Sequence, residues 1–449
     1  MPPLSPGPAP NTVRSARITL WRTSRAARRG GSSTGTGPRL SVLPGLPAAD
    51  PTATLALLTA IGAGVGLGTL SGLVPGLHAN TFALLLAAAA SSLPGPRLYV
   101  GVAMLSAGVT HTFLDVIPAL ALGVPDPAMA ASALPSHQLV IEGRGREALR
   151  LSALGSGLAV VFAVPLAVPL TLVMKRVYPL LRPWLSVLLV GVAVLLVVTE
   201  HGRRQQVGAA CSLAASGLLG VSLLDAPVTG ALPVSDVLVP LFSGLFGAPV
   251  LLAAIEGDGV PPQSDAAVTT PRRTVGVLAG IGTLCGGAVG YIPGISSAIA
   301  ATLALGLVSD QGPRAFIVTT SGVNTATAVF ALFALISLGT PRTGVLVALD
   351  RAEVPLVLPA LLAAVAIAAV AGAILVPTLG DRYLRIVGRL DPTYLSLSVI
   401  AVLVCLSALF AGLVGVGAFG AATAVGHLPP KFGARRATLM GVLLVPLAL

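Results

Sequence analysis

The chain has 449 residues, of which 55% are hydrophobic and only 10% are charged. Soluble globular chains carry about 25% charged residues, so this composition excludes an ordinary soluble enzyme. The net charge of +11 comes almost wholly from arginines, which stand in short loops between apolar runs and not on one surface. Such loops are typical of membrane proteins, and we expect no nucleic-acid partner.

Residues 1–50 are rich in Pro, Ser, Gly and Arg and have no acidic residue before Asp50. They lack the apolar core of a signal peptide. We predict a disordered basic N-terminal segment, and two further interpretations stay open. One is a functional segment, either a basic cytoplasmic arm or a targeting segment, and the other is an extension created by a start codon that was assigned too early.

Long continuous apolar runs fill the rest of the chain, without the alternation at every second residue that a transmembrane β-barrel needs. At about 20 apolar residues per crossing, residues 51–449 have room for about ten to twelve transmembrane helices. We therefore predict an all-α polytopic protein of the cell membrane. Three runs, 79–93, 295–309 and 437–449, are short and are expected to be half-helices or re-entrant segments.

Two distant stretches of the chain match each other. The segment 72–76 (GLVPG) corresponds to 290–294 (GYIPG), and each ends a ladder of glycines spaced four residues apart. This spacing puts the glycines on one helix face, where another backbone can approach closely, and the Pro-Gly pair then interrupts the helix. The ladders consist of Gly64, Gly68, Gly72 and Gly76, and of Gly282, Gly286, Gly290 and Gly294.

A second pair of matches follows the ladders in the same order. The segment 108–112 (GVTHT) corresponds to 322–326 (GVNTA), and 122–125 (LGVP) corresponds to 338–341 (LGTP). Ordered matches of this kind predict a duplicated unit.

The predicted organisation is a first transmembrane repeat at 51–255, a connecting loop at 256–273 and a second transmembrane repeat at 274–449. Duplicated halves with broken helices in corresponding places are typical of secondary transporters, and we expect the halves to be inverted. A half-helix N-terminus offers N–H donors and partial positive charge, which suit a carboxylate. The alternative is that the glycines only allow close packing and the prolines only kink the helices.

Polar side chains gather at the repeated motifs, although such groups are costly in a membrane unless they face a partner or a cavity. We therefore predict a substrate site at these motifs. His78 stands directly after the first break and is interpreted either as a substrate contact or as a helix cap. The candidate substrate-binding residues are Pro75, Gly76, His78, Asn80, Thr81, Thr110, Pro293, Gly294, Ser296, Ser297, Asn324 and Thr325.

Asp115 is the acidic residue within the apolar run 98–122, and His111 lies one helical turn before it. A carboxylate at this depth needs a cation, a proton or a bound Na⁺. Asp115 and His111 are the candidates for ion coupling, with Na⁺ or H⁺ as the coupling ion. A structural His–Asp pair, or an aspartate in water near a helix end, are the alternatives.

The sequence contains no HExxH, GxSxG or GxxxxGK[ST] motif, so we predict no catalytic residue and no enzyme. The three cysteines show no CxxC spacing, and we expect no metal site and no organic cofactor. An integral-membrane lipid-modifying enzyme is a weaker alternative, with His137, Glu142 and Arg144 as its candidate cluster. These residues are better explained by a cytoplasmic loop and a helix start.

Several motifs together resemble the large permease subunit of the tripartite tricarboxylate transporters, in its archaeal-type branch. The resemblance runs in order from residue 52 to residue 449. It rests on the segments 72–81 (GLVPGLHANT), 110–118 (THTFLDVIP), 122–127 (LGVPDP), 134–137 (LPSH), 142–148 (EGRGREA), 240–247 (PLFSGLFG), 428–430 (LPP) and 440–444 (MGVLL).

The resemblance implies a multi-spanning permease that moves small carboxylate anions across the bilayer with a cation gradient. It also implies two partners, a small membrane subunit and an extracytoplasmic solute-binding protein. The Tyr-Gly-Gly-Ser stretch of the bacterial members is replaced here by Thr110–Phe113. A lone permease or exporter for another small solute is therefore the alternative. Carried over, the resemblance puts the site at 75–81 and 293–297, lined by 110–115 and 324–327.

Overall fold

The computed structural model describes residues 50–75, 77–123, 133–231, 237–255, 260–265, 267–292, 297, 300–301, 304 and 312–449. Within these residues the regular structure is helical and contains no strand. Eight helical segments are long and apolar enough to cross a membrane, by length and composition. The prediction of an all-α polytopic membrane protein is confirmed. The N-terminal segment, Gly76, Pro293, Gly294 and Ser296 lie outside the described residues.

The helices of the first part of the chain extend to α11. They are α2 (Pro51–Leu73), α3 (Ala79–Ala89), α4 (Arg97–Leu114), α5 (Val116–Leu122), α6 (Ala133–Ile141), α7 (Gly145–Leu181), η3 (Arg182–Trp184), α8 (Leu185–Val198), α9 (Arg203–Leu223), α10 (Leu238–Phe242), η4 (Ser243–Gly247) and α11 (Ala248–Ala254). The helices of the second part are α12 (Arg272–Tyr291), α14 (Gly312–Leu338), α15 (Gly344–Arg351), α16 (Leu358–Val387), α17 (Pro392–Gly426), α18 (Leu428–Phe432), η6 (Arg436–Met440) and α19 (Gly441–Ala448).

Two of the eight apolar segments are much longer than one crossing. The segment Gly145–Val198 has 54 residues and Pro392–Phe432 has 41, whereas about 20 residues span a bilayer. The first is interrupted by the short 3-10 helix η3, and the second bends at Gly412, where φ is 59°. Each has room for two crossings. Three shorter apolar helices accompany the eight segments. The described residues thus contain eight candidate spans, and the number of ten to twelve transmembrane helices stays a prediction.

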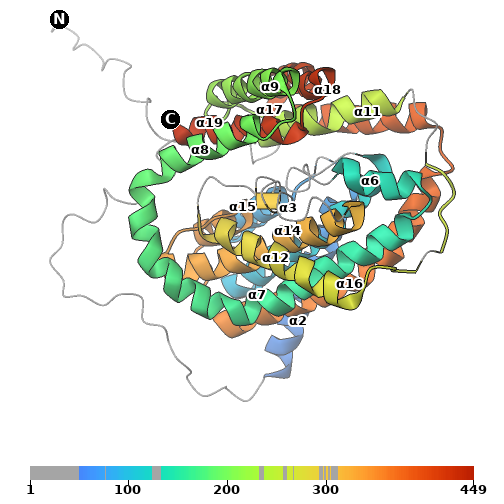
Figure 1. Ribbon diagram of the computed structural model, residues 1–449. Coiled ribbons are helices and arrows are strands. Elements are labelled where there is room, and N and C mark those ends of the chain that lie inside the picture. Colours follow the sequence, from blue (N-terminus) through green and yellow to red (C-terminus); the bar gives the residue numbers. More distant parts are fainter. Residues whose placement is uncertain are drawn as a thin grey trace, which may run out of the picture.

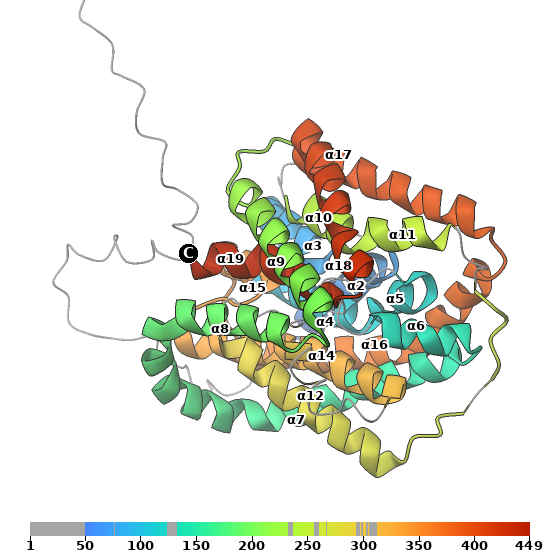
Figure 2. The same cartoon turned by 45° about the horizontal axis from the view of Figure 1, so that its top comes forward.

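The helices form two bodies with separate apolar cores (Figure 1). The first body contains α2 to α7, α12 and α14 to α16, and the second contains α8 to α11, η4 and α17 to α19. Helix α17 contributes buried side chains to both cores, whereas the buried apolar side chains of α11, Ala248 and Leu251, belong to the first core. Figure 2 shows α9, α18 and α19 lying across the face of the first body. The chain passes from the first body to the second twice, at η3 between α7 and α8 and again between α16 and α17.

Apolar side chains also cover much of the outer surface. Val187, Val190 and Val194 on α8 and Leu218 on α9 are all exposed. An apolar surface of this extent is unstable in water but is suited to lipid chains, while the helical backbone satisfies its own hydrogen bonds. The outer surface therefore agrees with a membrane location.

Both glycine ladders bring two helices into backbone contact. A Cβ atom added to Gly64 on α2 would lie 2.3 Å from the carbonyl oxygen of Ala103 on α4. A Cβ atom added to Gly282 on α12 would lie 2.4 Å from the carbonyl oxygen of Thr319 on α14. Both distances are too short for any side chain larger than hydrogen. The glycine ladders thus allow two helix backbones to approach closely, as the four-residue spacing predicts.

The same contact recurs one turn later along each ladder. Gly68 packs on Ala107, and Gly286 packs on Val323. The packing therefore equates Ala107 with Val323, so that Gly108 corresponds to Asn324. The sequence match paired Gly108 with Gly322, which is two residues away. The backbone contacts determine which residues of the two repeats correspond. A short motif of small residues can be matched at more than one offset in the sequence.

The two helix breaks also have the same geometry. Helix α2 ends before Val74 (φ −99°, ψ 110°), and α12 ends before Ile292 (φ −95°, ψ 120°). In both cases the extended residue still donates its N–H to the helix, to Leu70 and to Ala288 respectively. Equivalent packing and equivalent breaks support a duplicated unit. The limits of the two repeats and their inverted orientation stay predictions.

Candidate functional site

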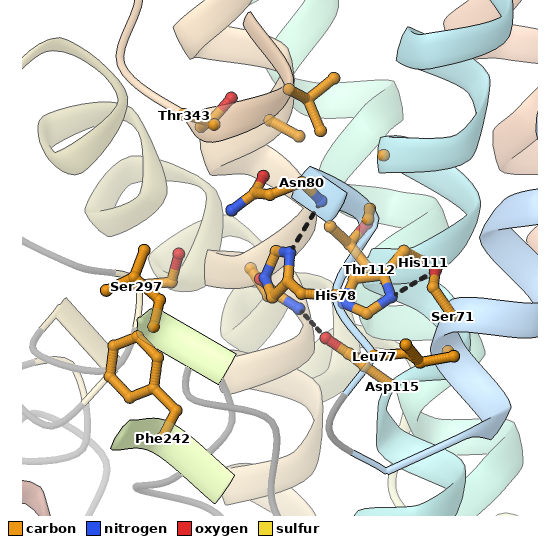
Figure 3. Close-up of a pocket in the computed structure, with 18 of the residues that line it drawn as sticks. Ser71, Leu77, His78, Asn80, His111, Thr112, Asp115, Phe242, Ser297 and Thr343 are labelled. Atoms are coloured by element: carbon orange, nitrogen blue, oxygen red, sulfur yellow. Dashed lines mark hydrogen bonds between the residues drawn. The ribbon is translucent and has the colours of Figure 1, made fainter. Parts of the chain in front are cut away.

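A cavity of about 340 Å³ lies between the two bodies (Figure 3). The first body supplies nearly all of its polar lining, from the α2–α3 break, α4, α14 and the start of α15. The second body supplies a mainly apolar wall, which includes Phe242, Met440 and Leu443. The polar lining residues are Ser71, His78, Asn80, His111, Thr112, Asp115, Ser243, Ser297, Asn324, Thr327, Arg342 and Thr343.

His78 closes the start of α3, the short helix that follows the first break. Its Nδ1 atom accepts a hydrogen bond of 3.1 Å from the backbone N–H of Asn80. In the neutral imidazole this leaves the proton on Nε2. The ring lies 4.6 Å from the ring of His111 and lines the cavity. His78 is therefore a helix cap, and its contact with substrate stays a prediction.

His111 and Asp115 both line the cavity from the end of α4, and both side chains are 2% exposed. Nδ1 of His111 lies 2.9 Å from the hydroxyl of Ser71 on α2. The Asp115 carboxylate accepts a hydrogen bond of 2.6 Å from the amide of Asn324 on α14. Asp115 itself occupies the turn where α4 passes into α5. The candidate coupling residues thus connect three helices of the first body.

The predicted threonines lie behind the cavity surface. Thr81 and Thr110 are buried and do not line the cavity, and Thr110 packs against Gly68. Thr325 also does not line it, but its hydroxyl lies 3.2 Å from that of Thr112, which does. The Thr112–Thr325 contact joins α4 to α14 beside the Asp115–Asn324 pair. These threonines support the site and do not form its surface.

Four polar lining residues were missed by the sequence-based prediction: Ser71, Ser243, Arg342 and Thr343. Arg342 stands in the turn between α14 and α15, and its guanidinium lies 4.8 Å from the centre of the Tyr178 ring. Thr343 caps α15 through its hydroxyl, which accepts from the N–H of Leu346. One signal pointed here, because the repeated segment 338–341 ends directly before Arg342.

Comparison with known proteins identifies the family. The model of the tripartite tricarboxylate transporter TctA family matches residues 58–441. The chain belongs to this family. A similar protein is the uncharacterized protein MJ1079 of Methanocaldococcus jannaschii, which is 27% identical over 286 residues, or 63% of this chain and 69% of that protein. No solved structure matches. The predicted resemblance is confirmed, and the archaeal relative agrees with the archaeal-type branch.

Membership of the TctA family makes the chain a multi-pass membrane protein of a transport system. Pro75 and Ser297 of the predicted site line the cavity of this TctA-family chain. The other predicted residues of the second break lie outside the described residues, as Gly76 does. Among the described side chains, no group of three or more His, Cys, Asp or Glu could hold a metal ion.

The residues of the alternative lipid-enzyme cluster have separate partners in the TctA-family fold. Nδ1 of His137 lies 2.6 Å from the carbonyl oxygen of Leu120. Arg144 donates to the carboxylate of Glu147 at 2.7 Å. The structure therefore gives His137 and Arg144 hydrogen-bond partners outside the cluster.

Proposed function

We propose that this TctA-family chain is a secondary-transporter permease that moves small organic anions, carboxylates in particular, across the cell membrane with an Na⁺ or H⁺ gradient. One observation carries the proposal. The cavity meets a broken helix, and a buried carboxylate, Asp115, lies among hydroxyl, amide and imidazole groups in its wall. Polar groups that are arranged around a helix break in an apolar protein are typical of transporter sites.

The cavity is suited to an anion. Helix α3 begins at the cavity, with His78, Ala79 and Asn80 in the lining, and helix N-termini attract negative charge. Arg342 adds a full positive charge to the same wall. Small-ligand pockets have volumes of about 300–1,000 Å³, and a cavity of about 340 Å³ is sufficient for a small carboxylate.

Asp115 is the proposed coupling residue, with His111 beside it. Asp115 is 2% exposed, and a bound proton or Na⁺ would neutralise the charge of its carboxylate. Its bond to Asn324 connects α4 with α14, so a change in its charge acts on two helices at once. Oxygen atoms of the Asp115 carboxylate and of Thr112 are the kind of ligand that hard cations prefer.

The test is uptake of labelled citrate and smaller carboxylates into proteoliposomes that contain this chain alone, under imposed Na⁺ or H⁺ gradients. Gradient-dependent uptake is expected, and the gradient that drives uptake identifies the coupling ion. Asp115→Asn should transport without dependence on that gradient or not at all. The control is Asp350→Asn, which removes an exposed carboxylate outside the cavity. If Asp115→Asn keeps the ion dependence of the wild type, Asp115 is not the coupling residue.

From membership of this tripartite family we also infer two partners, a small membrane subunit and an extracytoplasmic solute-binding protein. We expect that adding them lowers the substrate concentration needed for half-maximal uptake. Uptake that is the same with and without them would favour the second candidate, a lone permease. This candidate is favoured by the Thr110–Phe113 segment, which replaces the Tyr-Gly-Gly-Ser stretch of the bacterial members.

A further inference from the structure

Arg342 is a charged residue that the proposed function does not yet explain. It stands in the turn between α14 and α15, next to the Thr343 cap, and lines the cavity. Its guanidinium nitrogens Nε, Nη1 and Nη2 are all buried. Burying a guanidinium in an apolar protein is costly. A position that accepts this cost beside a cavity is a candidate for recognition of a charged ligand.

The surroundings hold the Arg342 guanidinium in a fixed orientation. The group lies 4.8 Å from the centre of the Tyr178 ring, near the end of α7, in cation–π geometry. Stacking on a ring face sets the plane of the guanidinium. The guanidinium N–H groups that bind carboxylates in a bidentate manner lie in that plane. Because the Arg342 side chain is already oriented, it loses little conformational entropy when it binds a carboxylate.

Arg342 lies beside the α2–α3 break. A Cβ atom added to Gly344 would lie 2.4 Å from the side chain of Asn80, so the start of α15 packs directly on the start of α3. Two recognition elements thus meet in one cavity, the N-terminus of α3 with His78 and Asn80, and the turn with Arg342. They come from opposite halves of the chain. A molecule with two or more carboxylates can place a separate carboxylate on each element.

We propose that Arg342 is the specificity-determining residue that binds the second carboxylate of a di- or tricarboxylate and thereby selects such anions over monocarboxylates. Tyr178 is its positioning residue. The inference rests on the proposed function, since it assumes that the chain transports carboxylates. It adds the residue that distinguishes substrates within that class.

The test measures uptake of citrate, succinate and acetate by the wild type and by Arg342→Gln in the same proteoliposome system. For Arg342→Gln, the concentration for half-maximal uptake of citrate and succinate should rise about 10- to 100-fold, as expected for loss of a charge-assisted bond. Acetate uptake should change less than about twofold. Arg342→Lys keeps the charge but loses the fork, so its effect should be intermediate.

The ratio of citrate to acetate uptake is measured within each preparation. Partial misfolding lowers the uptake of both anions and leaves this ratio unchanged. The matched control is Arg351→Gln, which removes an exposed arginine at the other end of α15. Tyr178→Phe retains the ring and should leave the ratio unchanged, whereas Tyr178→Leu should lower it. If Arg342→Gln does not fold, the citrate-to-acetate ratio of Arg342→Lys is compared with that of the wild type instead.

Two failures are distinguishable. If the wild type transports these anions but Arg342 variants reduce all of them equally, or none, the inference is wrong and the proposed function stands. If the wild type accumulates none of the three anions under either gradient, the proposed function is wrong, and the inference fails with it.

Discussion

Glu147 offers a test of how the first body is held together. Its side chain is fully buried near the start of α7. The carboxylate accepts from Arg144 at 2.7 Å, from two nitrogens of Arg314 on α14 at 3.0 and 3.2 Å, and from the backbone and hydroxyl of Thr269. One carboxylate therefore connects α7, α14 and the segment before α12.

Glu147→Gln removes the charge and keeps the shape. The amide retains one acceptor oxygen, but its NH₂ group then faces arginine donors. Breaking a buried ion pair costs about 3–5 kcal/mol because a charge loses its partner in a poor solvent. The Arg144 and Arg314 side chains are 32% and 30% exposed, so water offsets part of this loss. We expect the free energy of unfolding to fall by about 2–4 kcal/mol.

The assay is SDS titration in mixed micelles, followed by circular dichroism. The control is Asp265→Asn, which breaks a pair between Arg150 and a carboxylate that is 73% exposed. That change should cost less than about 1 kcal/mol, as exposed ion pairs do. If Glu147→Gln and Asp265→Asn unfold at the same SDS concentration as the wild type, the buried cluster does not stabilise the body and the reasoning is refuted.

Two further predictions use matched pairs of variants. Gly68→Ala should destabilise the chain by about 1–3 kcal/mol, because the new Cβ would lie 2.5 Å from the carbonyl oxygen of Ala107. Gly62→Ala on the same helix meets nothing within 4 Å and should be neutral or stabilising in the same titration, so equal effects would refute the ladder packing. His78→Ala should cost about 1 kcal/mol through loss of the α3 cap, and His78→Asn should restore it. If His78→Asn restores stability but not uptake, His78 also contacts the substrate.

The sequence predicted those parts of the fold that depend on local pattern. Continuous apolar runs gave the membrane helices, and the four-residue glycine spacing gave the contacts of α2 with α4 and of α12 with α14. The division into two bodies was not predictable, because it depends on which helices share a core. Helix α17 contributes to both cores, and α11 packs its buried side chains into the first core although it lies next to α17. The sequence of an apolar segment does not show which helices it packs against.

The candidate site was predictable where polar residues interrupt apolar runs, as His78, Asp115 and Asn324 do. The pairing of Asp115 with Asn324 was not predictable, because periodicity along one helix shows only neighbours on that helix and pointed to His111. Thr110 and Thr325 were predicted for the site by the same rule, but they fill space between helices. A polar residue in an apolar run is equally explained by a cavity or by a partner, and only packing distinguishes them.

Arg342 was missed for the opposite reason. It stands in a turn, where arginines are common and give no signal against a polar background. The fold makes it unusual, because α15 turns back onto α3 through the contact of Gly344 with Asn80 and carries the turn into the cavity wall. The polar groups of the cavity thus come from both halves of the chain but almost all from one body. The second body adds a wall of apolar residues such as Phe242 and Leu443. An apolar wall forms few hydrogen bonds with an anion, so recognition in this site depends on the first body, and substitutions there should change substrate choice far more than substitutions in the wall.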